Sequence, residues 1–374
     1  MTAATVDPPV APAPDPEPGR RRRALAIPRL RHCIAVAAAG ALILLAIPAL
    51  SGVPWSSIGS ILGAVPVIGL TGLFLVWVLG LLAHTITLTA ALPTLTHRRA
   101  LTLSLTGSAV ANVLPVGGAA GVALNYRMAR TWGFDRGQIA AYTVVTNVWD
   151  VLAKLVLPLL ALPLLLLTAH STVHQLLGPV AVGTAALALV AGLALATFVN
   201  ASVAHRVGTV AESLTGMVLR GSGSQRQVEV RKHLVDLQAR CGPLMRQRWR
   251  RLTLGMSLYT TSLLILLWAC LHLTAAGLAP TAVLAAFAVE RLLTLPGLTP
   301  GGAGVVEVGL SGALLVLGGL PAGVVAGVLL YRALTFGLEI PVGGIGLLGW
   351  WWARRRAAVR GAAGLPSTEL VGSA

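Results

Sequence analysis

Long apolar runs, separated by short polar and basic connections, dominate the chain. Each unbroken run has roughly 20 residues or more, enough for a helix rising about 1.5 Å per residue to cross the hydrocarbon core of a bilayer. The pattern predicts an all-α polytopic membrane protein. The runs cover residues 33–50, 65–92, 100–126, 138–167, 176–199, 252–273, 281–317 and 322–352.

Two of these runs carry a proline and a glycine pair in their middle. Lipid cannot satisfy the backbone amides of a broken helix, so such breaks are tolerated where they are buried in protein or line a wet cavity. Broken segments at corresponding places in two halves of a chain point to the binding site of a transporter. Two loops between short ordinary spans are the simpler alternative. The residues concerned are Asn112, Pro115, Gly117 and Gly118 in the first break, and Pro300, Gly301, Gly302, Gly304 and Glu307 in the second.

Composition and charge agree with a membrane protein. The chain is 56% hydrophobic and only 11% charged, whereas a soluble domain carries about 25% charged residues. The net charge of +16 does not indicate nucleic acid, because the basic residues form short blocks at the ends of apolar runs, which is how membrane orientation is encoded. Anionic lipid at the cytosolic face is the expected partner. The three cysteines are scattered and indicate neither disulfides nor zinc.

The basic residues also predict the topology. All but three of the 28 lysines and arginines lie in residues 1–32, 93–99, 126–137, 200–251 and 353–374. These segments should be cytosolic by the positive-inside rule. Residues 100–126 must then enter and leave by the inner face, and residues 281–317 by the outer face. We therefore predict about six full spans plus two re-entrant helical hairpins, arranged as an inverted repeat.

This topology divides the chain into segments. Residues 1–32 form a disordered Pro/Arg-rich cytosolic tail, and 33–50 a retained first span. Both termini are expected in the cytosol. The cytosolic insertion carries two amphipathic helical patterns around a Gly-Ser linker; these helices either lie on an anionic leaflet or cap the bundle. The membrane halves are 33–168 and 176–352, the second including the basic insertion 200–251, and 353–374 is a cytosolic tail.

Ionisable residues also occur inside the apolar runs, where each should face the interior and have a partner. Asp150 and Lys154 are four residues apart and should pair on one helix face. Glu290 and Arg291 are neighbours whose directions diverge by about 100°, so we expect them not to pair with each other. Structural ion pairs and substrate binding are both compatible with this set, which comprises Asp150, Lys154, Glu290, Arg291, Glu307, Arg332 and Glu339.

The glycine pairs suggest anion binding. A glycine pair that opens a half-helix presents free amides at the positive end of the helix dipole, which suits a phosphate. Two such half-helices meeting near the midplane would hold the anionic group of a lipid. We expect this group near the amides of residues 301–304, with Arg332 as its charged partner.

These residues carry a family resemblance. The segment from Asn112 to Gly118, the following Tyr126-Arg127, the segment from Leu295 to Glu307 and the later Arg332 resemble the transmembrane region of lysylphosphatidylglycerol synthases and related flippase-like membrane proteins. The resemblance covers most of residues 33–350 and implies lipid translocation. Many relatives have Gly-Glu at the first glycine pair, where this chain continues with alanines. The synthases also carry a soluble aminoacyl-transferase domain, whose activity is not expected here.

Other function classes have weaker signals. An integral membrane lipid- or glycosyl-transferase, or its accessory subunit, would need an acidic metal-binding cluster or a catalytic histidine near an acid. His84 and His272 instead stand alone in apolar runs. A scaffold without substrate would use the buried charges only for cohesion. No nucleotide-binding Gly-x-x-x-x-Gly-Lys motif occurs, so we expect no direct ATP coupling, no cofactor and no metal.

Overall fold

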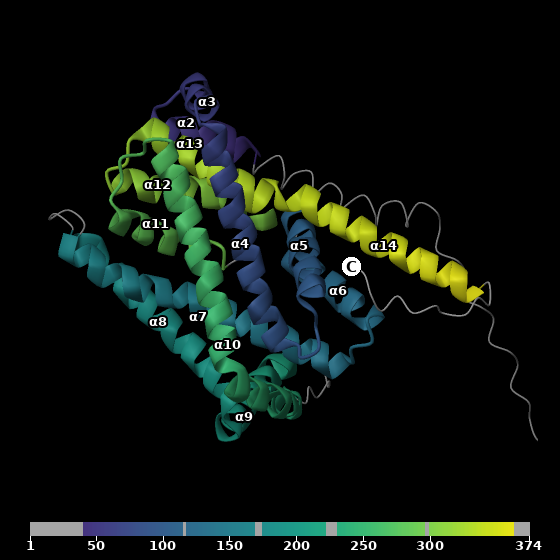
Figure 1. Ribbon diagram of the computed structural model, residues 1–374. Helices are drawn as coiled ribbons and strands as arrows, with labels where there is room; N and C mark the ends of the chain where they lie inside the picture. Colours follow the sequence, from purple (N-terminus) through teal and green to yellow (C-terminus); the bar gives the residue numbers. More distant parts are fainter. Residues whose placement is uncertain (1–39, 115–116, 169–173, 222–229, 296–298, 363–374) are drawn as a thin grey trace, which may run out of the picture.

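The chain is helical throughout the part that the computed structural model describes, residues 40–114, 117–168, 174–221, 230–295 and 299–362. Figure 1 shows the helices gathered around two long ones, α4 and α10. The elements are η1 (Leu42–Ala46), α2 (Ile47–Ser51), α3 (Trp55–Gly63), α4 (Val67–Ala91), α5 (His97–Val113), α6 (Gly117–Thr131), α7 (Arg136–Thr168), α8 (His174–Val199), α9 (Ala201–Gly221), α10 (Val230–Leu273), α11 (Pro280–Leu293), η3 (Pro300–Gly302), α12 (Val305–Val316), α13 (Pro321–Arg332), η4 (Ala333–Gly337) and α14 (Glu339–Ala362).

Five of the described helical segments are long and apolar enough to cross a membrane. A sixth span results if η1–α2 and α3, which meet at a 94° bend, are counted together. The all-helical polytopic fold is therefore confirmed. The five segments are Val67–Ala91, Arg136–Leu165, Ala181–Val199, Leu234–Leu273 and Pro321–Arg356.

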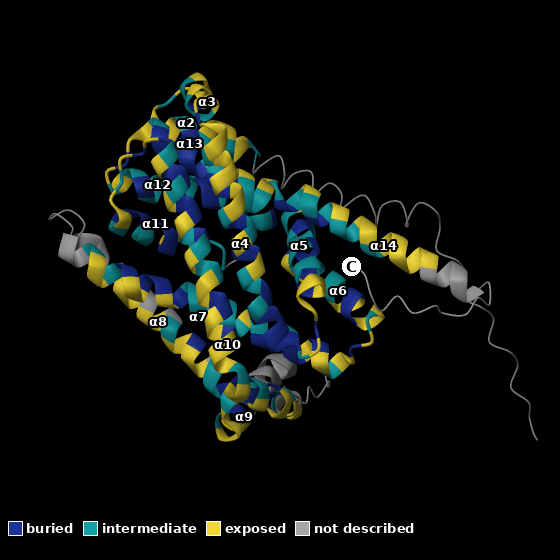
Figure 2. Ribbon diagram, in the orientation of Figure 1, coloured by how far each residue is buried: buried dark blue, intermediate teal, exposed yellow. Residues whose placement is uncertain are grey.

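The exposed surface of these segments is strongly apolar. Ile68, Leu79, Leu189 and Ile345 are each more than half exposed, and Figure 2 shows exposed residues along the outer sides of α8 and α14. In water such a surface would cost free energy in proportion to its apolar area. In a bilayer this surface contacts acyl chains instead of water. Exposed apolar side chains are therefore expected on these segments.

Both predicted breaks interrupt helices. The first separates α5 from α6, which pack against each other, and the second separates α11 from α12, which also pack together. The chain before α11 and the chain after α12 lie next to each other, because the Leu320 amide donates to the Ala276 carbonyl oxygen at 2.9 Å. At the first break, Leu95 before α5 and Phe134 after α6 belong to one hydrophobic cluster.

The buried apolar residues form two main clusters through which α4 and α10 both run. One surrounds Phe287 and Tyr331 and joins α11, α12 and α13. The other surrounds Met128 and Met245 and joins α5, α6 and the start of α7. Each pair of short helices therefore has its own core, and the two long helices connect them.

Two segments differ from the sequence-based expectation. The second amphipathic pattern of the cytosolic insertion and the following span form one helix, α10, which continues through Pro243. The last apolar run is interrupted by the π-helical turn η4, directly after Arg332. No proline or glycine pair in the sequence predicts this turn. π-Helical turns within α-helices occur frequently at functional sites.

Candidate functional site

The second break is a turn that only glycine accommodates well. Gly301, Gly302 and Gly304 have φ values of +56°, +73° and +83°, in the left-handed region where a β-carbon is unfavourable. Pro300 begins the short 3-10 turn η3, and Val305 begins α12. The sequence Pro-Gly-Gly-x-Gly thus reverses the chain between α11 and α12.

An ion pair holds this turn in place. Arg332 Nε donates to Glu307 Oε1 at 2.7 Å, and its Nη2 donates to the Gly301 carbonyl oxygen at 2.9 Å. Glu307 Oε2 accepts from the Gly304 amide at 2.6 Å. Both charged side chains are at least nine-tenths buried. Charge-assisted bonds of this kind are about twice as strong as neutral ones, so Arg332 and Glu307 together fix both ends of the glycine turn.

Of the amides of residues 301–304 that we expected to be free, those of 302–304 are hydrogen-bonded, which corrects this part of the sequence-based prediction. The amides of Gly302 and Ala303 each donate at 3.0 Å, to the carbonyl oxygens of Thr299 and Pro300. The Gly304 amide donates to Glu307. The carboxylate of Glu307 therefore occupies the position at the positive end of α12 that we expected a phosphate to take.

The two breaks meet in space. Turn η3 contacts both α5 and α6, and a β-carbon added to Gly301 would come within 2.5 Å of Asn112 Oδ1 and of the Phe336 ring. Phe336 also lies under the guanidinium of Arg332, 4.9 Å from ring centre to Cζ. Asn112, which we predicted as a site residue in the first break, is thus packed against the second break. Pro115 lies outside the described residues.

The first glycine pair has a different role from the second. Gly117 is buried, and a β-carbon there would come within 2.0 Å of the Ala111 carbonyl oxygen. Gly118 has open space around its β-position. Gly117 thus allows close packing of α6 on the end of α5, as small residues do between membrane helices. Arg127 lies exposed on α6.

Glu290 and Arg291 do pair with each other, contrary to the expectation from helix geometry. Arg291 Nε and Nη2 both donate to the Glu290 carboxylate, and Nη2 also donates to the Tyr331 hydroxyl at 3.2 Å. The argument from the 100° divergence failed because the long arginine side chain folds back across its own helix near the helix end. Arg332 and Glu307 satisfy each other instead.

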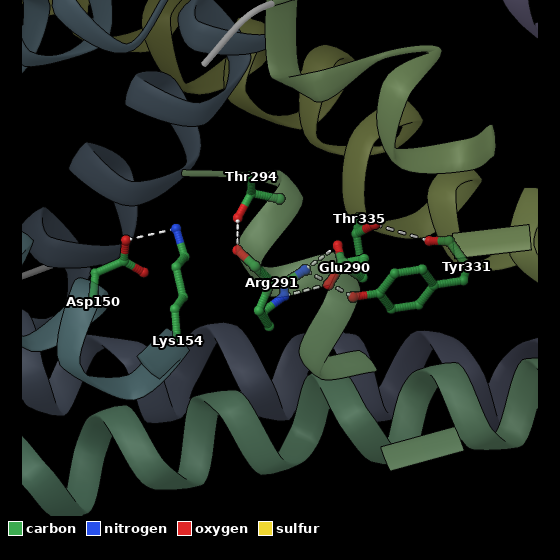
Figure 3. A network of polar contacts seen from close by, with 7 residues as sticks. All are labelled: Asp150, Lys154, Glu290, Arg291, Thr294, Tyr331 and Thr335. Carbon is green, nitrogen blue, oxygen red and sulfur yellow. Dashed lines mark hydrogen bonds and ion pairs between the residues drawn. The ribbon is translucent and has the colours of Figure 1, made fainter. Parts of the chain in front are cut away.

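Asp150 and Lys154 form the predicted pair on α7, with Lys154 Nζ 2.8 Å from Asp150 Oδ2. Figure 3 shows this pair beside α11, with Arg291 between it and Tyr331. Helices α7 and α11 pack together. The Asp150 side chain is 42% exposed, so this pair is less desolvated than the other two.

These pairs converge on one region. Tyr259 of α10 is within electrostatic range of Asp150, Glu290, Arg291 and Glu339 together. Glu339, the first residue of α14, is buried, and Ser108 and Asn112 of α5 lie close to its carboxyl group. We call Asp150, Lys154, Glu290, Arg291, Glu307, Arg332 and Glu339 the interior charged residues.

Sequence reasoning missed a polar stripe that leads to this region. Ser104, Ser108 and Asn112 recur every four residues on α5, a spacing that places them on one helix face. His84 of α4, which we expected to be a hydrogen-bonded interior residue, has its Nδ1 3.1 Å from Ser104 Oγ and stacks on Tyr259 at 4.4 Å between ring centres. The four-residue spacing was visible in the sequence, whereas the histidine contact depends on how α4 packs.

The pair Asp150–Lys154 gives a first test. Replacing Lys154 alone by glutamine should lower the melting temperature in detergent more than replacing Asp150 by asparagine and Lys154 by glutamine together, because the single change leaves an uncompensated charge. Thermal unfolding of the two variants checks this. A double variant that is less stable than the single one would contradict structural pairing. A stable double variant that moves no lipid would assign the pair to the mechanism.

Comparisons with known proteins place this site in context. The model of the family described as lysylphosphatidylglycerol synthase TM region matches residues 33–343. No curated protein and no solved structure matches the chain. The match covers every interior charged residue and both glycine breaks. Among the described residues, no group of three histidine, cysteine, aspartate or glutamate side chains could hold a metal ion.

Proposed function

Because the chain belongs to the lysylphosphatidylglycerol synthase transmembrane-region family, we propose that it moves a phosphate-bearing lipid between the leaflets of the cell membrane. It acts on the lipid without chemical conversion. The contact between the two breaks, Asn112 against Gly301, supports the proposal most directly. It brings backbone that has left regular helical structure together with charged side chains, as in transporters that bind substrate at discontinuous helices.

The interior charged residues supply the recognition. Arg291, Arg332 and Lys154 come from three different helices, and Arg332 donates to the Gly301 carbonyl oxygen at this contact. Each is already paired with a carboxylate, so a lipid phosphate binds by competing for a guanidinium and not by filling empty amides. Arginine suits this role because its planar fork can hold a carboxylate on one edge and a phosphate on another. As the lipid moves, a guanidinium therefore exchanges its carboxylate partner for the lipid phosphate.

We further propose that α5–α6 and α11–α12 are re-entrant hairpins from opposite faces, so that the two halves form an inverted repeat. The hydrogen bond between Leu320 and Ala276, where the second pair of helices enters and leaves, supports this for one hairpin. The shared cluster of Leu95 and Phe134 supports it for the other. The basic connections favour both termini in the cytosol.

Cysteine labelling tests this topology. In a background without the native cysteines, single cysteines at Ala279 and Leu320 should both react with an impermeant thiol reagent added outside intact cells. Single cysteines at His97 and Arg136 should both be protected until the membrane is opened. All four positions are exposed at the ends of the two helix pairs. Opposite reactivity within either pair would mean that the pair crosses the membrane and is not re-entrant.

Lipid movement itself is measured with the purified protein in phosphatidylcholine liposomes that contain a trace of fluorescent phosphatidylglycerol. A membrane-impermeant reductant added outside bleaches the outer-leaflet probe. Without protein about half of the fluorescence should persist, and with protein it should fall further as inner-leaflet probe moves out. Equal protected fractions in protein-containing and protein-free liposomes would contradict the proposed function.

A further inference from the structure

The interior charged residues include one more acid than cations. The three cations are each paired, Lys154 with Asp150, Arg291 with Glu290, and Arg332 with Glu307. No ion pair joins Glu339 to any lysine, arginine or histidine within the described part of the chain. Glu339 is nevertheless only 8% exposed. An ionised carboxylate without a cation at this depth is costly, whereas a protonated one is not.

The surroundings of Glu339 suit both of its protonation states. Its partners Ser108 and Asn112 are neutral. A serine hydroxyl and an asparagine amide can each donate to a carboxylate or accept from a carboxylic acid. The carboxyl group therefore has neutral neighbours that can donate to its ionised form or accept from its protonated form. The other three acids in this region each have a cationic partner.

The charged groups that face Glu339 lie at longer range. Arg332 of α13 and Arg291 of α11 act on it electrostatically, as does Tyr259 of α10. From α5, against which α14 packs, only the neutral Ser108 and Asn112 reach it. Both arginines are engaged by other carboxylates.

We propose that Glu339 carries a proton whose uptake and release are coupled to lipid movement, so that the protein is a proton-linked lipid transporter. The inference rests on the proposed function. With Glu339 ionised the region holds four carboxylates and three cations, Lys154, Arg291 and Arg332, which disfavours an anionic phosphate. When a proton from water binds the carboxylate, the charges balance and a lipid phosphate is admitted. Release of the proton at the other face restores the negative charge.

The polar stripe on α5 marks the side from which the proton reaches Glu339. Ser108 lies near Glu339, and Ser104, one turn earlier, has its Oγ 3.1 Å from Nδ1 of His84. His84 in turn lies in the field of Asp150, whose side chain is 42% exposed. Hydroxyl and imidazole groups can each pass a proton on, so we place the route of the proton to Glu339 along this interface between α4 and α5.

Glu339→Gln tests the coupling in the liposome assay. A pH gradient across the liposome membrane should accelerate the movement of fluorescent phosphatidylglycerol by the wild-type protein. This acceleration should be absent in Glu339→Gln. Asp236→Asn, which changes an exposed acid on α10, should retain it. If the wild type moves lipid but ignores the gradient, or if Glu339→Gln responds as the wild type does, the coupling is wrong while the proposed function stands.

Protonation of Glu339 is measured separately from transport. Infrared difference spectra of the purified protein, recorded between acidic and alkaline solutions, should contain a C=O stretching band of a buried carboxylic acid. The band should be present in Asp236→Asn and missing in Glu339→Gln. Its persistence in Glu339→Gln would overturn the assignment. If the band follows the prediction while no lipid moves in any liposome, the proposed function fails and the proton site remains.

Discussion

Arg332→Gln is expected to lower the stability of the folded protein strongly. The change leaves the Glu307 carboxylate, which is only 4% exposed, without its cation and removes a donor from the Gly301 carbonyl oxygen. Breaking a buried ion pair from one side costs about 3–5 kcal/mol. The melting temperature of the purified variant in detergent should therefore fall well below that of the wild type.

The matched control neutralises both partners. Glu307→Gln together with Arg332→Gln should be more stable than Arg332→Gln alone, because no uncompensated charge remains and glutamine can still accept from the Gly304 amide. If the double variant is the less stable of the two, loss of the Arg332–Glu307 ion pair does not explain the effect of Arg332→Gln. Arg332 then stabilises the fold through other contacts.

Lipid movement by Arg332 variants separates charge from geometry. Arg332→Lys keeps the positive charge but has a single donor nitrogen in place of the two, Nε and Nη2, that bond to Glu307 Oε1 and the Gly301 carbonyl oxygen. We expect it to retain part of the activity and Arg332→Gln to retain little, both measured on folded, monodisperse protein. Wild-type rates in Arg332→Gln would remove this arginine from the proposed lipid-binding site.

The spans were predictable because hydropathy is a property of each segment alone. Residues 65–92 were expected in a helix and form α4, Val67–Ala91. The helix breaks were predictable for a similar reason, since Pro300 and the glycines after it together disfavour continuation of an α-helix. The π-helical turn at Ala333–Gly337 was not, because its sequence has no such breaker before Gly337 and the turn depends on surrounding packing.

The candidate site was predictable as a set of residues but not as a set of contacts. The depth of Arg332 and Glu307 in apolar runs indicated that each needs a partner, and they partner each other. The fold-back of Arg291 onto Glu290 depends on side-chain length, which an argument from helix directions leaves out. The contact of Glu339 with Ser108 depends on α14 packing against α5, and no local pattern encodes that.

Gly301→Ala is expected to abolish lipid movement while the protein still inserts into the membrane. Gly301 has φ of +56°, where an alanine costs about 1–2 kcal/mol. The added methyl group would also come within 2.5 Å of Asn112 Oδ1 and of the Phe336 ring. It therefore pushes the two breaks apart at the point where they meet. Residue 301 faces protein and not lipid headgroups, so insertion of the apolar spans should be unaffected.

Two further glycines provide matched controls. Gly302→Ala introduces similar backbone strain, at φ of +73°, but its methyl group meets only Val306 of the same segment. Gly118→Ala adds a methyl group in open space at the first break. If the contact between the breaks is what lipid movement requires, activity should fall in the order Gly118→Ala, Gly302→Ala, Gly301→Ala. Equal losses in Gly301→Ala and Gly302→Ala would assign the effect to the shape of the turn alone. Full activity in Gly301→Ala would separate lipid movement from the meeting of the two breaks.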